Sequence, residues 1–131
     1  MTTTLFENTT AFAGFSVDDA DRAAQFYRDT LGLTVNDAGE PGVLLIDLPG
    51  GAQVLAYTKA NHQPATFTML NFPVPDIEAA VAELTRRGVS FLRYADTQLE
   101  TDEQGIFREG GPLIAWFTDP AGNVIAVLED A

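Results

Sequence analysis

Cysteine is absent from this sequence of 131 residues, and histidine occurs once, as His62. The lack of cysteine excludes disulfides, thiolate metal sites and a cysteine nucleophile. His62 stands in the polar stretch 59–65, where we expect a surface residue, and one histidine leaves little room for a histidine metal site or triad. The N-terminus carries no charged and apolar leader, and no apolar run approaches the length that spans a bilayer. These absences predict a globular, cytoplasmic protein without a membrane partner.

Basic side chains are also scarce, with 7 Lys and Arg against 19 Asp and Glu and a net charge of −12. Nucleic acid is excluded as a partner, because neutralising its phosphates needs a basic surface. The charge permits a cationic ligand, although most surplus acid serves solubility. Much of it is local, in the acidic residues Asp96, Glu100, Asp102, Glu103 and Glu109.

The chain is 46% hydrophobic, and its length suits a single domain, 1–131, with a real core. Two apolar runs near the C-terminus flank the turn residues 119–123, which predicts a hairpin. Both runs are apolar on both faces. We therefore expect one face to meet helices and the other to line a cavity or a partner.

One order of elements occurs twice along the chain. The apolar spacing predicts a first strand at 11–17, a helix capped by Asp18 or Asp19 and running to about Leu31, and strands at 33–36, 43–48 and 53–58. It then predicts a strand at 67–74, a helix between Asp76 and Gly88, and strands at 89–94, 113–118 and 124–129. The repetition indicates an internal duplication, with one module at about 10–58, a linker at 59–65 and a second module at about 66–129.

Two phrases carry a family resemblance, GFSVDDADRAAQFYRDTLGL at 14–33 and FPVPDIEAAVAELTRRGV at 72–89. Together with the later FTDPAGNVI, they resemble the vicinal oxygen chelate superfamily, which includes glyoxalase I, bleomycin-resistance proteins and extradiol dioxygenases. The resemblance implies an α+β fold of two βαβββ modules, whose curled mixed sheets surround a shared cavity. It also implies a homodimer.

Enzymes of that superfamily hold a divalent metal with His, Glu or Gln at one place on each of four strands. The resemblance carries these places onto Phe12, Ala56, Met69 and Ala126. Phenyl and methyl groups have no lone pair to give, and a thioether is too soft for such a metal. We therefore expect no metal and no cofactor, and we assign no catalytic residue.

Strand alternation predicts which side chains share the face of those four positions. Most are apolar, and they include no carboxylate or imidazole, which favours a binding pocket over an active site. The predicted ligand-binding residues are Phe12, Ser16, Ala56, Thr58, Met69, Asn71, Trp116 and Ala126. Trp116 is interpreted as a ligand wall rather than core, and Asn71 either as a satisfied structural amide or as a ligand donor.

Three functions follow from these interpretations. The first is a metal-free, bleomycin-resistance-like protein that sequesters a small, partly aromatic and optionally cationic molecule in an apolar cavity. The second is a lyase, isomerase or dioxygenase, which the missing metal ligands disfavour. The third is a dimeric interaction or regulatory domain. Residues 95–111 form either a lid over the cavity or a hairpin with its own strand at about 104–108.

Overall fold

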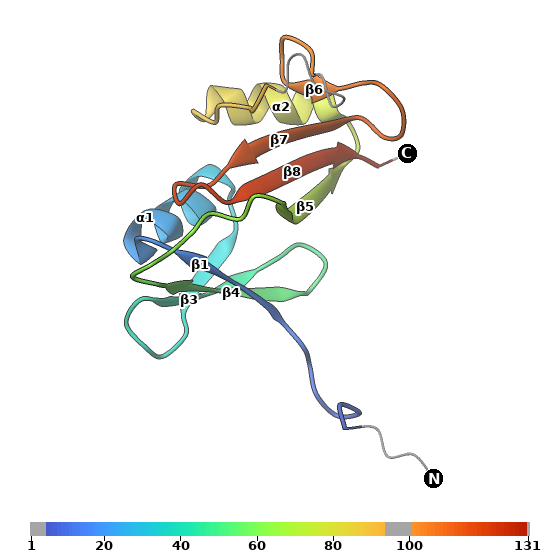
Figure 1. Cartoon of the computed structure of the whole chain (residues 1–131). Coiled ribbons are helices and arrows are strands. Elements are labelled where there is room, and N and C mark those ends of the chain that lie inside the picture. The colour runs from blue at the N-terminus through green and yellow to red at the C-terminus, as the bar shows by residue number, and fades with distance from the viewer. Residues whose placement is uncertain (1–4, 94–100, 131) are drawn as a thin grey trace.

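The computed structural model describes residues 5–93 and 101–130 (Figure 1). Its strands form two four-stranded mixed sheets, and with the helices they confirm the predicted α+β class. The strands form separate sheets rather than one closed barrel. Within the described ranges, no helix is long and apolar enough to cross a bilayer.

Each module supplies one sheet. Sheet A has the order β1-β4-β3-β2, built from β1 (Ala13–Val17), β4 (Gln53–Thr58), β3 (Val43–Asp47) and β2 (Thr34–Asp37). Sheet B has the order β5-β8-β7-β6, built from β5 (Thr68–Val74), β8 (Val124–Glu129), β7 (Ile114–Thr118) and β6 (Ile106–Phe107). The first strand of each module is parallel to the last, and the other pairs are antiparallel. This common pattern supports the interpretation as a duplication.

Both helices begin at a predicted aspartate cap. The Asp19 carboxylate accepts hydrogen bonds from two backbone N–H groups of α1 (Ala20–Gln25), which continues as the π-helical turn η1 (Phe26–Thr30). The Asp76 carboxylate accepts the N–H of Ala79 in α2 (Ile77–Arg86). These caps satisfy donors that the first turn of a helix leaves without partners.

The two modules share one hydrophobic core. Tyr27 is fully buried in it, and the ring of Phe26 packs both on Tyr27 and on Phe117 of sheet B. The second helix packs on β7 and β8 (Figure 1). One face of each sheet therefore packs in this core, and no helix within residues 5–93 and 101–130 covers the opposite face.

The strand predicted at 89–94 is wrong over its described part, 89–93. Phe91 makes only an isolated bridge to Phe117, and the N–H of Leu92 donates to the carbonyl of Trp116 at 2.7 Å. The reason is that β6 already pairs with Ile114 and Ala115 of β7. Little of the free edge of β7 is left for a second strand. Because β6 falls within 104–108, the hairpin interpretation of 95–111 is confirmed there, while 94–100 lie outside the described residues.

The predicted hairpin between β7 and β8 is confirmed. Its turn closes with a hydrogen bond of 3.0 Å from the N–H of Asp119 to the carbonyl of Asn123. Gly122 has a φ of 85°, and a Cβ there would lie 3.0 Å from Cγ of Pro64. Glycine is therefore required both for the left-handed backbone and for the close approach of the linker.

Candidate functional site

The helix-free face of sheet B, called face B, brings together three predicted ligand-binding residues. Asn71 of β5 pairs with Ala126 of β8, and Ala126 pairs with Trp116 of β7. Paired residues of neighbouring strands point to the same side of a sheet. The three side chains therefore form a single row across face B, as strand alternation predicts.

The Trp116 indole does not stand upright from the sheet but leans across β8 toward Thr68, which pairs with Val124 of β8. Its Nε1–H donates to Oγ1 of Thr68 at 3.2 Å, although Thr68 belongs to β5 and β8 lies between the two strands. Adjacent strands are about 4.8 Å apart, so the ring has to cross β8 to make this bond. Ala126 is the residue of β8 beneath it and is only 1% exposed. The indole needs a methyl group there, because a larger side chain would lift it.

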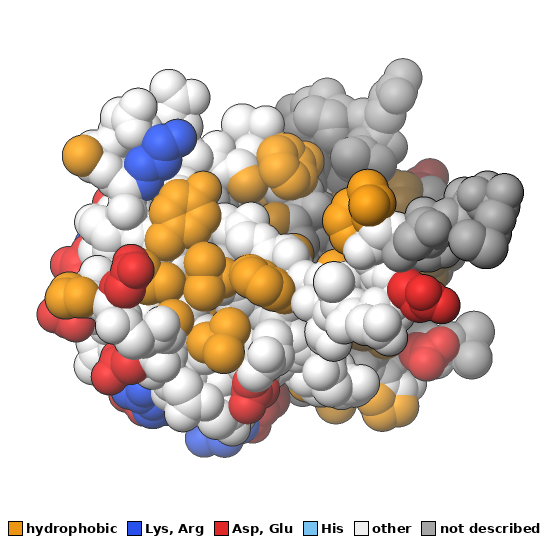
Figure 2. All heavy atoms as spheres, turned by 90° about the horizontal axis from the view of Figure 1, so that it is seen from below, with side chains coloured by type: hydrophobic (Ala, Val, Ile, Leu, Met, Phe, Trp, Pro, Cys, Tyr) orange, Lys and Arg blue, Asp and Glu red, His pale blue; other side chains and the backbone are white. Residues whose placement is uncertain are grey.

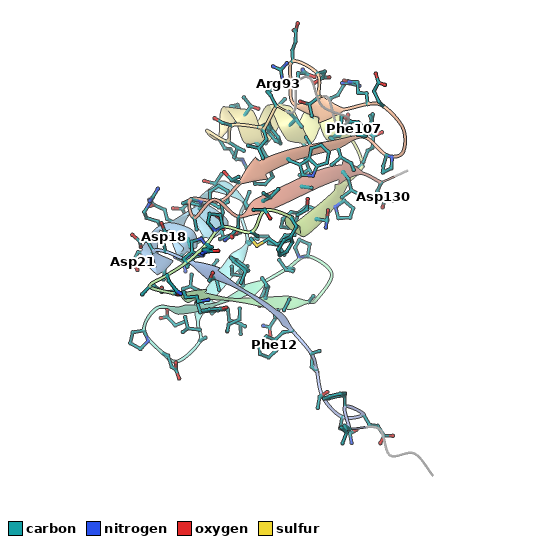
Figure 3. All side chains as sticks on the ribbon, in the orientation of Figure 1. Phe12, Asp18, Asp21, Arg93, Phe107 and Asp130 are labelled. Carbon is teal, nitrogen blue, oxygen red and sulfur yellow. The ribbon has the colours of Figure 1, made fainter. Side chains whose placement is uncertain are left out.

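Face B is aromatic at one end of the row and polar at the other. The ring of Phe107 lies 6.2 Å from that of Trp116, with an angle of 49° between the planes, so the two extend one aromatic surface. Figure 3 labels Phe107 beside β7. Asn71, at the opposite end, is exposed and can present its amide to a bound molecule. The row itself contains no carboxylate or imidazole that could act as a general base.

The helix-free face of sheet A, called face A, carries an apolar group of side chains beside polar ones, since the register also places Asp47, Thr34 and Gln53 on it. The register places Ser16 beside Tyr57, Tyr57 beside Val43, and Leu55 beside Leu45. Tyr57 is 38% exposed and its apolar neighbours are half-buried. Figure 2 shows hydrophobic side chains gathered on the side of the molecule where sheet A lies.

The prediction that Ala56 and Thr58 share a face with Ser16 is wrong. Ala56 pairs with Phe15, is fully buried, and belongs to the shared core, and Thr58 pairs with Val17 of that same core face. Alternation within a strand is fixed, but the phase between β1 and β4 depends on their register. The face A residues of β4 are therefore its neighbours, Leu55 and Tyr57.

Phe12 and Met69 lie at the margins of the two faces. Phe12 precedes β1 and is 63% exposed. Met69 stands at an irregularity in the pairing of β5 with β8, between Thr68 and Leu70, and packs against the core. The structure therefore does not bring these two residues into the row of Asn71 and Trp116.

His62, expected at the surface, is half-buried and joins three parts of the chain. Its Nε2 lies 2.9 Å from the carbonyl oxygen of Ala121, and its Nδ1 lies 2.7 Å from Oγ of Ser16. A carbonyl only accepts, so Nε2–H of His62 donates to Ala121, and the other ring nitrogen contacts the Ser16 hydroxyl. This imidazole ties the linker to both modules. The sequence holds no local signal of this role, because Ser16 is 46 residues away.

A second polar cluster joins the modules inside the core. The hydroxyl of Tyr27 donates to Oδ2 of Asp119 at 2.7 Å, and the buried Asp119 carboxylate also accepts from Nδ2 and the N–H of Asn123 and from the N–H of Ala121. Burial, then the negative charge of Asp119 and its hydrogen bond, raise the pKa of Tyr27 far above its ordinary value. The amide of Asn123 also donates to the carbonyl of Ser16 and accepts from the N–H of Ala65.

The predicted acidic cluster is partly neutralised by arginine. Asp102 and Glu78 both form ion pairs with Arg108, at 2.7 and 2.8 Å. Burial raises the pKa of Asp102, but hydrogen bonds from Arg108 and two backbone N–H groups outweigh burial and lower the pKa overall. Asp96 and Glu100 lie outside the described residues.

The four metal positions do not fit a divalent metal. Phe12, Met69 and Ala126 offer no hard donor, and Ala56 faces the core on the opposite side from face A. The described residues also contain no group of three or more His, Cys, Asp or Glu that could hold an ion. These four side chains therefore supply no ligands for a catalytic metal.

Comparisons with known proteins show which family this chain matches. A family model described as the Glyoxalase/Bleomycin resistance protein/Dioxygenase superfamily matches residues 9–127. A comparison of the sequence with curated proteins found no match.

Solved structures of similar fold cover nearly the whole chain. TnmS3, an antibiotic binding protein from Streptomyces sp. CB03234, is 23% identical, with a TM-score of 0.65, over 95% of this chain and 98% of that one. A superfamily member from Sphaerobacter thermophilus is 24% identical, with a TM-score of 0.64, over 92% and 98% of the two chains. A glyoxalase / bleomycin resistance protein from Catenulispora acidiphila is 23% identical, with a TM-score of 0.62, over 93% and 98%. At these identities the likeness shows the fold alone.

Proposed function

Because this chain belongs to the glyoxalase/bleomycin resistance protein/dioxygenase superfamily, we propose that it binds a small, partly aromatic molecule on face B, without a metal and without catalysis. The observation that carries the proposal is the row of Asn71, Ala126 and Trp116. It combines a flat aromatic ring, a small residue that lets the ring lie down, and an exposed amide. Such a surface can hold and orient a planar ligand.

The indole is expected to add to the affinity for an aromatic ligand. Aromatic pairs contribute about 0.5–1.5 kcal/mol beyond the area that they bury, and a cationic ligand over a ring gains up to about 2 kcal/mol. The net charge of −12 adds a long-range attraction for cations that salt weakens. The similar fold of an antibiotic binding protein supports small-molecule binding, and we propose that this chain sequesters its ligand in the cytoplasm.

We propose that the binding unit is a homodimer in which face A of one copy covers face B of the other. Both faces carry a group of apolar side chains, and among the described residues no helix of the same chain covers either face. Covering face B would also remove water from the ligand and strengthen its polar contact with Asn71. Light scattering at low micromolar concentration should report a dimer, and a monomer would refute this arrangement.

The absence of catalysis is proposed from the donor chemistry of the four metal positions. Protein purified without chelator and without an affinity-tag metal should contain no stoichiometric zinc, nickel, manganese or iron by elemental analysis. It should also leave the methylglyoxal–glutathione adduct unchanged. Near-stoichiometric metal would overturn this proposal and favour a lyase, isomerase or dioxygenase.

Ligand binding is tested with a panel of planar aromatic compounds, neutral and cationic. Trp116 is the only tryptophan, so its fluorescence reports contact directly. By calorimetry, Trp116→Ala should weaken the best ligand at least about tenfold, whereas Trp116→Phe, which keeps a ring, should lose about threefold or less. Equal affinities in all three proteins would show that face B is not the site.

A second candidate function is an interaction domain whose dimer matters more than its ligand. The apolar side chains of face A favour it, since Tyr57, Leu45 and Leu55 suit a protein surface as well as a ligand cover. A dimer that binds no compound of the panel would support this candidate.

A further inference from the structure

An apolar hollow of about 250 Å³ lies on the side of sheet B opposite face B. Phe117 and Val127 belong to its lining, and they are the strand neighbours of Trp116 and Ala126. Because side chains alternate along a strand, Phe117 and Val127 point away from face B. The hollow is therefore separate from the ligand surface proposed above.

Both modules contribute to this hollow, which we call the seam pocket. Leu31, Leu33 and Pro49 come from module one, and Phe72 and Leu84 come from module two. All of these except Pro49 pack against the shared core and remain partly exposed. An apolar cavity of about 150 Å³ can hold benzene, so the seam pocket has room for an apolar body of about ten carbon atoms. Its size therefore suits a small-molecule site.

Charged side chains join the lining at the end of α2, where Glu83 and Arg87 stand. The Glu83 carboxylate accepts from Nε of Arg87 at 2.7 Å and from Nε of Arg86 at 3.1 Å. These hydrogen bonds, that of Arg86 first, lower the pKa of Glu83 to about 2, so its carboxylate stays ionised. Two arginines for one carboxylate leave this cluster with a single positive charge, in a chain with a net charge of −12.

Arg87 keeps a hydrogen-bond donor for a ligand. Its Nη1 donates to the carbonyl of Thr30 at 2.9 Å, which ties the end of α2 to η1 and holds the guanidinium beside the hollow. Its Nη2 bonds to no other group within residues 5–93 and 101–130. Guanidinium groups form short, charge-assisted hydrogen bonds with carboxylates, so an acid is the ligand that this donor suits.

We propose that the seam pocket binds a small hydrophobic carboxylic acid, with its apolar body between Leu31 and Leu84 and its carboxylate on Arg87. Charge selects this class of ligand, because a carboxylate complements the positive cluster at the end of α2 and an amine would be repelled by it. The apolar lining excludes a strongly polar body. This site is additional to face B, and it requires neither the aromatic ligand proposed there nor the dimer.

Calorimetry with naphthoate and decanoate tests the proposal, because these acids share a carboxylate and differ in the shape of the apolar body. At least one of them should bind, with one molecule per chain. Tighter binding of naphthoate would identify the ligand as an aromatic acid, and tighter binding of decanoate as an aliphatic one. If neither acid binds, the proposal is refuted.

The contact with Arg87 has a matched control in Arg86. Arg87→Gln and Arg86→Gln each remove one positive charge and one partner of Glu83, but only Arg87 lines the seam pocket. Arg87→Gln should weaken the tighter acid at least about tenfold, and Arg86→Gln about threefold or less. Equal weakening by both variants would reduce the effect to long-range charge and refute the contact.

A second pair of variants tests the position of the apolar body. Ala80 lines the seam pocket, so Ala80→Phe should fill it and weaken the acid at least about tenfold, whereas Ala79→Phe, at an exposed position of the same helix, should stay within about twofold. Circular dichroism shows whether both variants fold, and the arginine pair decides alone if Ala80→Phe does not. Trp116→Ala should leave the affinity for the acid within about twofold. Loss of the acid in Trp116→Ala but not in Ala80→Phe would place it on face B, which would overturn the seam pocket and leave the proposed function standing.

Discussion

Replacement of Tyr27 by Phe removes one hydroxyl from the cluster that joins the two modules. Tyr27 is fully buried, and its O–H donates to the Asp119 carboxylate at 2.7 Å. A hydrogen bond to a charged group contributes about 1.5–3 kcal/mol. Three donors remain on Asp119 after the change, from Ala121 and Asn123, so the carboxylate is not left unpaired. We therefore expect Tyr27→Phe to lower the free energy of unfolding by about 1.5–3 kcal/mol.

Urea unfolding measures this loss, and Tyr57→Phe is its control. Tyr57 is 38% exposed, so water can bind its hydroxyl. The control should therefore change the free energy of unfolding by less than about 0.5 kcal/mol. The double variant with Asp119→Asn should lose less stability than the sum of the two single variants, because both substitutions remove the same hydrogen bond, between Tyr27 and Asp119. A loss below about 0.5 kcal/mol in Tyr27→Phe would refute the assignment of this bond.

The same tyrosine gives stability a dependence on high pH. The pKa of Tyr27 is raised in the folded protein by burial and by Asp119, whereas in the unfolded chain it is about 10. Because the folded pKa is the higher one, the contribution of the protonated Tyr27 to stability is complete below about pH 10 and is lost as the pH rises above that value. The free energy of unfolding should fall by up to about 1.4 kcal/mol per pH unit there, and Tyr27→Phe should remove that part of the slope.

Three further changes test other parts of the site. Ala126→Leu should lift the indole from β8 and shift the fluorescence emission of Trp116. Titration should show aromatic ligands binding about tenfold or more weakly. Unchanged emission would refute the flat orientation of the indole. His62→Ala should cost about 1–3 kcal/mol in urea, because it releases the linker from both modules, while a neutral result would make His62 an ordinary surface residue. The pKa of Asp102 is lowered, so its contribution to stability is present above about pH 3.9 and is lost as the pH falls through the lower folded pKa. Asp102→Asn should therefore reduce the dependence of the free energy of unfolding on pH below about pH 3.9.

Features set by short-range chemistry could be predicted from the sequence. Asp19 and Asp76 cap their helices because an aspartate side chain reaches N–H groups two or three residues ahead. The turn 119–123 forms because its aspartate and glycine fit one backbone path. The row of Asn71, Ala126 and Trp116 was predicted correctly, since alternation along each strand happened to agree with the pairing between strands.

Features set by pairing between distant segments could not be predicted. The position of Ala56 depends on the register of β1 against β4, which no local pattern specifies. The partners of His62 and Tyr27 lie 46 to 92 residues away, so no local pattern indicates these bonds, and His62 was expected at the surface. The predicted strand at 89–94 failed for the same reason, because β6 competes for the edge of β7.

The shared core has a consequence for fragments of this chain. Phe26 and Tyr27 complete the packing around Phe117 and Asp119, and the linker between the modules is held at His62 and Ala65 by bonds that do not depend on an unbroken backbone. A cut in the exposed linker at Asn61 should therefore leave two pieces that are each unfolded alone and that fold on meeting. We expect the two halves to recognise each other in this way because they share one hydrophobic core.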